Sequence, residues 1–179
     1  MCYHVLEERN VMKKLFLIIS CLILASSVYA QGASEPRLDG ILTAGEYSET
    51  QLINGIIIGT SLSADGSMLY VVVSAKTSGW VAVGLGSMRM NGSIMVMGYA
   101  EGGKQSISFE LGKGYSHATT SIKDAKAFAV QEGDVTTIEV SVPAAAYVKN
   151  SVLQMNAAFG PKDDFKSKHT KRAAIEFTY

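Results

Sequence analysis

The chain has 179 residues, of which 47% are hydrophobic and 18% charged, and its formal net charge at pH 7 is zero. This balance is that of an ordinary folded protein, and it excludes a disordered chain, a basic nucleic-acid-binding surface and an acidic tail. A chain of this length most simply forms one domain.

The first thirty residues have the pattern of a secretory signal peptide. A basic segment begins at Met12, the apolar run 15–25 follows, and small residues at the −3 and −1 positions predict cleavage after Ala30. The run is too short for a comfortable transmembrane helix. We expect Met12 to be the initiator and residues 1–11 to be an upstream start. Residues 18–21 also fit a lipoprotein acylation box at Cys21, but the apolar run continues past this cysteine, which favours a signal peptide and a periplasmic or secreted protein.

The predicted mature chain, residues 31–179, contains no cysteine, because Cys2 and Cys21 leave with the leader. This excludes a disulfide, a thiolate metal site, an iron–sulfur cluster and covalent c-type haem attachment. A metal or haem would have to be held by His, Met, Lys, Tyr or carboxylate side chains.

The mature chain consists of short runs of strand-forming residues separated by turn signals. Asp-Gly and Ala-Gly dipeptides mark a turn-rich entry at residues 36–47, and β-branched, aromatic or alternating runs predict strands after it. A loop is expected at 112–117, a short helical turn at 143–150 and a charged loop at 160–172. The predicted strands are residues 54–62, 68–75, 80–85, 94–100, 105–111, 125–131, 136–142, 152–159 and 173–179.

No part of the mature chain shows a sustained helical period. Roughly eight or nine short strands with turns between them predict an all-β fold, an immunoglobulin-like antiparallel β-sandwich. Because no repeat or linker interrupts the pattern, we expect residues 31–179 to form a single domain.

Residues 79–99 hold the only tryptophan, Trp80, and four of the eight methionines. Met95 and Met97 share one strand face and are interpreted as packing residues. Met88 and Met90 lie beyond the strand in a glycine-bounded loop, where burial does not explain them. A methionine sulfur can bind haem iron or Cu(I) without losing a proton.

Two histidines remain in the mature chain, His117 and His169, and both are expected in loops. Without cysteine, a haem iron would most naturally take one His and one Met, a pair that raises the potential and suits electron transfer. Two other interpretations stay open at this point. Methionines two residues apart, at 88/90 and 95/97, could bind Cu(I), and the aromatic side chains of Trp80 and Tyr99 could contact sugar, although they more simply pack a core.

The order of motifs resembles the DOMON domain. GWVAVGLG, a methionine-containing turn, SIMVMGY and an EGGK turn follow one another, and the resemblance continues through ISFELGKGYSH. It ends with MNAAFG, a section that includes His169, and the strand AAIEF. The early LDG…GEY is also similar to the opening of many DOMON and related carbohydrate-binding sandwiches.

The resemblance extends to the haem-binding branch of this family, which includes the cytochrome domain of cellobiose dehydrogenase. It implies an exported b-type cytochrome domain with a non-covalent haem b and Met/His axial ligation. Matching Tyr99 to the aromatic residue of the family's strand places the ligand methionine on Met90, not Met88. The late histidine of the family falls on His169.

The chain departs from the family pattern around the second ligand. The family usually has His-Gly there, and this chain has His169-Thr170 in a loop with many basic residues. Some relatives use Met and Lys, which leaves Lys168 as an alternative ligand. The lysines could also pair with haem propionates, face a partner or remain solvated. His117 is not the axial ligand in the haem examples of the family, and Trp80 is expected to pack the core or the macrocycle.

The sequence contains no Ser-His-Asp set, no glycine-rich dinucleotide loop and no second domain for a dehydrogenase. We therefore expect an electron carrier rather than an enzyme, with a redox partner protein in the cell envelope. Neither a nucleic-acid partner nor a membrane-spanning segment of the mature chain is expected. The alternatives are a carbohydrate-binding DOMON module without haem and a periplasmic Cu(I)-binding protein.

Overall fold

The computed structural model describes residues 35–179. The predicted leader, its cleavage after Ala30 and the expected start at Met12 lie outside the described residues. Within the described part of the chain, no helix has the length and hydropathy needed to span a bilayer.

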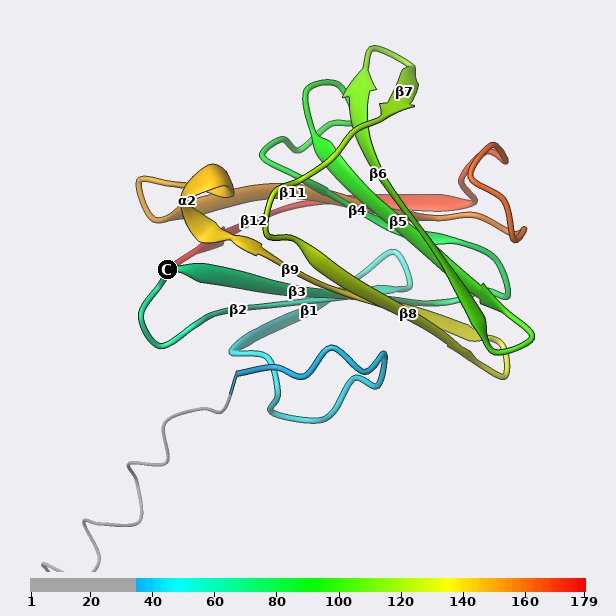
Figure 1. The fold of residues 1–179 in the computed structure, drawn as a ribbon, viewed down its shortest axis with the longest axis horizontal. Coiled ribbons are helices and arrows are strands. Elements are labelled where there is room, and N and C mark those ends of the chain that lie inside the picture. The colour runs from blue at the N-terminus through cyan, green and yellow to red at the C-terminus, as the bar shows by residue number, and fades with distance from the viewer. Residues whose placement is uncertain (1–34) are drawn as a thin grey trace, which may run out of the picture. The chain divides into compact units, whose positions relative to one another are not determined.

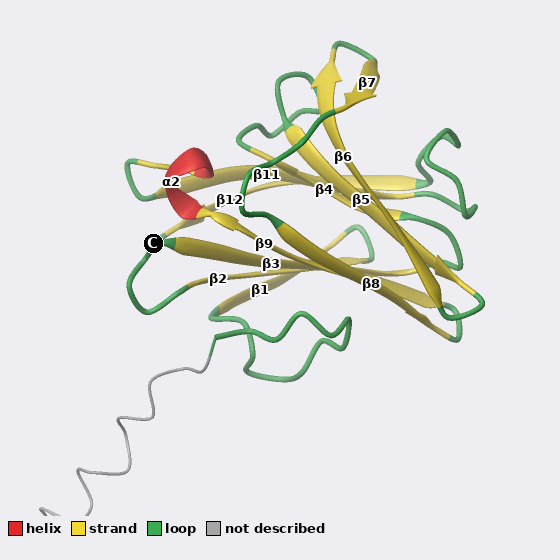
Figure 2. Ribbon diagram, viewed as in Figure 1, coloured by secondary structure: helices red, strands yellow, loops and turns green. Residues whose placement is uncertain are grey.

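Strands make up most of the described residues, and they follow an entry segment without regular structure (Figures 1 and 2). One short helix, α2 (Ala144–Tyr147), separates β9 from β10. The strands are β1 (Glu49–Ile53), β2 (Ile56–Leu62), β3 (Met68–Lys76), β4 (Val81–Leu85), β5 (Ile94–Glu101), β6 (Lys104–Lys113), β7 (Ser116–Thr119), β8 (Lys126–Glu132), β9 (Val135–Pro143), β10 (Val148–Lys149), β11 (Val152–Phe159) and β12 (Lys171–Thr178).

The strands form two antiparallel sheets. The first sheet has the order β1-β2-β3-β9-β8, and the second has the order β10-β11-β4-β5-β6-β7 with β12 paired to β11. Alternate side chains of both sheets meet in one core, because successive residues of a strand point to opposite faces. Residues with no exposed surface in this core include Val71, Val83, Val96, Ile138 and Leu153. The predicted antiparallel β-sandwich is confirmed.

The entry segment packs on the outer side of the first sheet and is fastened by Glu139 of β9. This carboxylate is completely buried and accepts hydrogen bonds from the Asp39 amide at 2.8 Å, the Gly40 amide at 2.6 Å and the Tyr47 hydroxyl at 2.8 Å. Burial raises the pKa of Glu139, and these three donors partly oppose that effect. The LDG…GEY stretch is therefore a structural anchor in this chain.

The prediction missed three of the strands. β1 and β7 consist almost entirely of exposed residues, and β10 has only two residues, so none of them shows apolar alternation. β1 pairs with β2 through a two-residue turn in which Asn54 and Gly55 both have positive φ, the conformation that a tight hairpin needs. The expectation that His117 lies in a loop is wrong, because it lies in β7. The helical turn expected within 143–150 is confirmed as α2.

Candidate functional site

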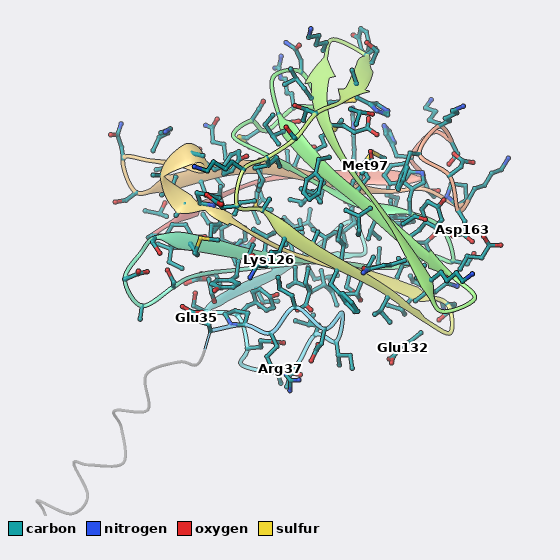
Figure 3. All side chains as sticks on the ribbon, viewed as in Figure 1. Glu35, Arg37, Met97, Lys126, Glu132 and Asp163 are labelled. Carbon is teal, nitrogen blue, oxygen red and sulfur yellow. The ribbon has the colours of Figure 1, made fainter. Side chains whose placement is uncertain are left out.

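The candidate site is the face of the second sheet that points away from the first sheet. Val81, Val83 and Leu85 of β4 point into the core, so Ala82 and Gly84 occupy the outer face. The same alternation brings the methionines of β5 to this face. Met97 is labelled in Figure 3 on the side of β5 away from the first sheet.

The centre of this outer face is built from small residues and thioethers. In the strand register, Ala82 lies between Met97 on β5 and Ala158 on β11, and Gly84 lies between Met95 and Asn156. Met95 is 6% exposed, Met97 4% and Ala82 6%. The prediction that these two methionines are packing residues is confirmed, although they pack on the outer face and not between the sheets.

Aromatic side chains close one end of the outer face. Trp80 is buried, and its indole Nε1 donates a hydrogen bond to Ser167 Oγ at 2.9 Å. The rings of Tyr99 and Phe165 lie with their centroids 5.0 Å apart at 53°. Because Ser167 and Phe165 belong to the loop between β11 and β12, that loop is held directly against this aromatic cluster.

Backbone contacts fix the same loop. The Trp80 amide donates to the Lys162 carbonyl at 3.1 Å, and the Gly160 amide donates to the Trp80 carbonyl at 2.9 Å. A Cβ atom on Gly160 would lie 2.1 Å from Trp80 Nε1, so a glycine is required beneath the indole. Asp164 accepts backbone hydrogen bonds from Ser167 and Lys166, which lower its pKa.

The second predicted ligand follows this ordered turn. His169 is half-buried, and the amide of the next residue, Thr170, donates to the Phe159 carbonyl at 2.7 Å. His169 is thereby placed directly before β12. Lys168, the alternative ligand, has an exposed side chain.

The loop between β4 and β5 covers the other end of the outer face. Asn156 reaches across Gly84 and donates from Nδ2 to the Ser87 carbonyl at 2.9 Å and to the Arg89 carbonyl at 3.2 Å. A Cβ atom on Gly84 would lie 2.4 Å from Asn156 Nδ2. Glycine at position 84 therefore leaves the space through which Asn156 holds the loop.

The two loop methionines differ in their surroundings. Met90 is half-buried, and its carbonyl oxygen accepts hydrogen bonds from the Ser93 amide at 3.1 Å and the Ser93 hydroxyl at 2.9 Å. A Cβ atom on Gly112 of β6 would lie 3.1 Å from Met90 Cγ, so Met90 packs directly against that strand. The Met88 side chain is 41% exposed.

A carboxylate–imidazole pair lies at the same end as Met90. Glu110 of β6 is 6% exposed and accepts a hydrogen bond from Ser108 Oγ at 2.7 Å, and its other oxygen is hydrogen-bonded to His117 Nδ1. His117 pairs with Gly112 in the register of β6 and β7. Glu110 was not among the predicted site residues, because only the unpredicted strand β7 brings His117 to it.

The structure thus divides the predicted residues between two ends of one face. Trp80, Tyr99 and the loop that contains His169 lie where β4 begins, and Met90 lies in the loop that follows the end of β4. Four residue steps along β4 cover about 13 Å. Between the two ends, β4 itself contributes only Ala82 and Gly84 to the outer face, and Asn156 of β11 covers Gly84.

A cavity of about 530 Å³ borders the aromatic end, between the β5–β6 turn and β8. Asp163, labelled in Figure 3, lines it together with Glu101 and Phe128. One carboxylate oxygen of Asp163 is buried without a hydrogen-bond partner among the described residues. Burial raises the pKa of Asp163, and the charges of Glu101 and Asp164 raise it further.

Comparison with solved structures finds this fold in two cytochrome domains. The chain matches the cytochrome b domain of pyranose dehydrogenase from Coprinopsis cinerea with a TM-score of 0.55 and 15% identity, over 69% of this chain and 76% of that chain. It matches the cytochrome domain of Myriococcum thermophilum cellobiose dehydrogenase with a TM-score of 0.53 and 12% identity, over 69% and 74%. No protein-family model and no curated protein matches the sequence. The chain has the fold of the DOMON-type cytochrome domains, as its resemblance predicts.

Proposed function

We propose that the chain is an exported b-type cytochrome domain that transfers single electrons through a non-covalent haem b, with Met90 and His169 as axial ligands. The observation that carries the proposal is the outer face of the second sheet. Its centre has small side chains, and the two loops that close its ends contain Met90 and His169. The fold shared with two cytochrome domains supports the proposal.

The chemistry of this face fits a haem. The side chains of Ala82, Ala158 and Met97 make this face apolar, and it is covered by Phe165 at one end and by Asn156 over Gly84 at the other, so a haem would take the place of these covering side chains. A buried apolar surface binds a macrocycle through area removed from water. Methionine and histidine are a ligand pair used by cytochromes, and a haem held by them supplies a centre that gains and loses one electron.

The other predicted residues take supporting roles in this proposal. Trp80 and Tyr99 form the wall on the histidine side, and Phe165 completes it. This wall would exclude water from one side of the haem. Lys168 remains the alternative to His169, and its exposed side chain makes it the weaker candidate. The partner would be a redox protein of the cell envelope.

Haem titration of the purified protein tests the proposal. We expect a Soret band and a low-spin, six-coordinate spectrum. Met90→Ala and His169→Ala should each give high-spin or haem-free protein, because each removes one axial ligand. Met88→Ala and His117→Ala are matched controls of the same residue types and should keep the low-spin spectrum.

Several results would contradict the proposal. If no Soret band forms, the chain is not a cytochrome, and the cavity beside Asp163 is then the place to test for sugar binding. If Met88→Ala proves more damaging than Met90→Ala, the ligand assignment is wrong by two residues. If Lys168→Ala abolishes the low-spin spectrum and His169→Ala does not, Lys168 is the second ligand.

A further inference from the structure

An exposed patch with apolar and basic side chains lies at the end of the second sheet beyond Met90. We call it the tip patch, and it consists of Met88, Arg89, Lys113 and Tyr115. Tyr115 is fully exposed and Met88 is 41% exposed. They belong to the few large hydrophobic side chains of residues 35–179 that face solvent. The two side chains stand on loops that are hydrogen-bonded to each other, and exposed apolar surface rimmed by polar residues marks interaction sites.

The basic side chains of the tip patch are available to a partner. Arg89 and Lys113 are exposed, and neither forms an ion pair within residues 35–179. The nearest carboxylate on β6, Glu110, is buried and hydrogen-bonded to His117, so it is withdrawn from the surface. The tip patch therefore presents positive charge beside apolar surface.

Hydrogen bonds between two loops hold the tip patch together. The Gly114 amide donates to Asn91 Oδ1 at 2.8 Å, and the Gly92 amide donates to the Gly112 carbonyl at 3.0 Å. Figure 1 shows the β6–β7 turn beside the β4–β5 loop. An interface whose loops are already fixed loses less conformational entropy on binding than a mobile one.

We propose that the tip patch is the docking surface for a redox protein that presents carboxylates around an apolar contact. Tyr, Met and Arg are enriched in interfaces, and complementary charge increases the rate of encounter. The inference rests on the proposed function in one respect: Met88 and Arg89 directly precede Met90, so a partner docked here lies against the segment that holds the ligand. A second copy of this chain would bring like charges together and is disfavoured.

Binding is tested first without haem. The isotope-labelled protein is titrated with reduced plastocyanin, a copper protein with an acidic surface, and amide shifts are followed by NMR. We expect the largest shifts at residues 88–92 and 113–116 and an affinity that falls as salt is added. The Arg89→Glu/Lys113→Glu double variant should bind plastocyanin at least about tenfold more weakly than the wild type. Lys104→Glu, a charge reversal at the opposite end of β6, should change the affinity less than about twofold.

Electron transfer is tested next with haem-loaded protein. Reduced protein is mixed with Cu(II) plastocyanin, and one electron passes from ferrous haem to copper, giving ferric haem and Cu(I). The second-order rate constant should fall about tenfold in the Arg89→Glu/Lys113→Glu variant while the Soret band is unchanged. Tyr115→Ser should also slow the reaction, and Leu52→Ser, at a side chain that is 71% exposed in β1, should not.

The two proposals fail in different ways. Absence of a Soret band overturns the cytochrome function. The docking surface is then tested by the NMR titration alone. Shifts centred on the β11–β12 loop, or equal binding by the charge-reversed protein, overturn the docking surface while the haem spectrum stands. Self-association that Tyr115→Ser abolishes would identify the occupant as a second copy and would also overturn the inference.

Discussion

Gly84→Ala tests whether Asn156 holds the loop that contains Met90. The new methyl group would lie 2.4 Å from Asn156 Nδ2, so the amide has to move away. Its hydrogen bonds to the Ser87 and Arg89 carbonyls would then be lost. The substitution adds one methyl group on the outer face and leaves the core unchanged.

The magnitude follows from these contacts. Two hydrogen bonds at about 1 kcal/mol each contribute about 2 kcal/mol to the free energy of unfolding. Alanine in a strand is about 0.5–1 kcal/mol better than glycine. Gly84→Ala should therefore destabilise the protein by about 1–1.5 kcal/mol, or about 2–6 °C in Tm for a domain of this size. Asn156→Ala should cost about 2 kcal/mol.

A double-mutant cycle by urea unfolding makes the test specific. Once Asn156 is alanine, the methyl group at position 84 meets no amide, so the double variant should be no less stable than Asn156→Ala alone. The two substitutions should show a coupling of about 2 kcal/mol. Additive effects, or a Gly84→Ala protein as stable as the wild type, would refute the role assigned to Asn156. Haem affinity should fall in parallel with stability in both single variants.

Three further outcomes are expected. Gly160→Ala should displace the Trp80 indole and shift the fluorescence of the only tryptophan to the red, and unchanged emission would contradict the packing described for this pair. Glu139→Ala leaves the buried Gly40 amide and Tyr47 hydroxyl and the half-buried Asp39 amide without their acceptor, and it should cost about 2–5 kcal/mol in urea unfolding. Burial raises the pKa of Asp163, so its contribution to stability is present below the unfolded-state pKa and is lost as pH rises through the native pKa. The Tm of Asp163→Asn should therefore rise relative to that of the wild type as the pH rises above about 4, and a difference that stays constant with pH would show that Asp163 has no such role.

Much of the fold was predictable because its signals are local. Alternation along 105–111 and the Asp-Gly turn before β3 act within a few residues, and they predict strands and hairpins without knowledge of distant contacts. The glycine-bounded loop before β5 separates Met88 and Met90 from the strand residues Met95 and Met97, and the structure places the two pairs in different surroundings. Strands that make no apolar alternation, such as β1 and β7, give no such signal, and the structure alone reveals them.

The sequence by itself determined that the chain is an antiparallel sandwich and which residue types could bind a cofactor without cysteine. Only the tertiary structure decided that the methionines of β5 lie on the outer face, that Asn156 holds the Met90 loop across Gly84, and that Glu110 bonds His117. The physical reason is that alternation separates the two faces of a strand but does not say which face meets the other sheet. Strand register between distant segments decides which face meets the other sheet, and it also sets the loop that contains Met90 and the loop that contains His169 at opposite ends of β4.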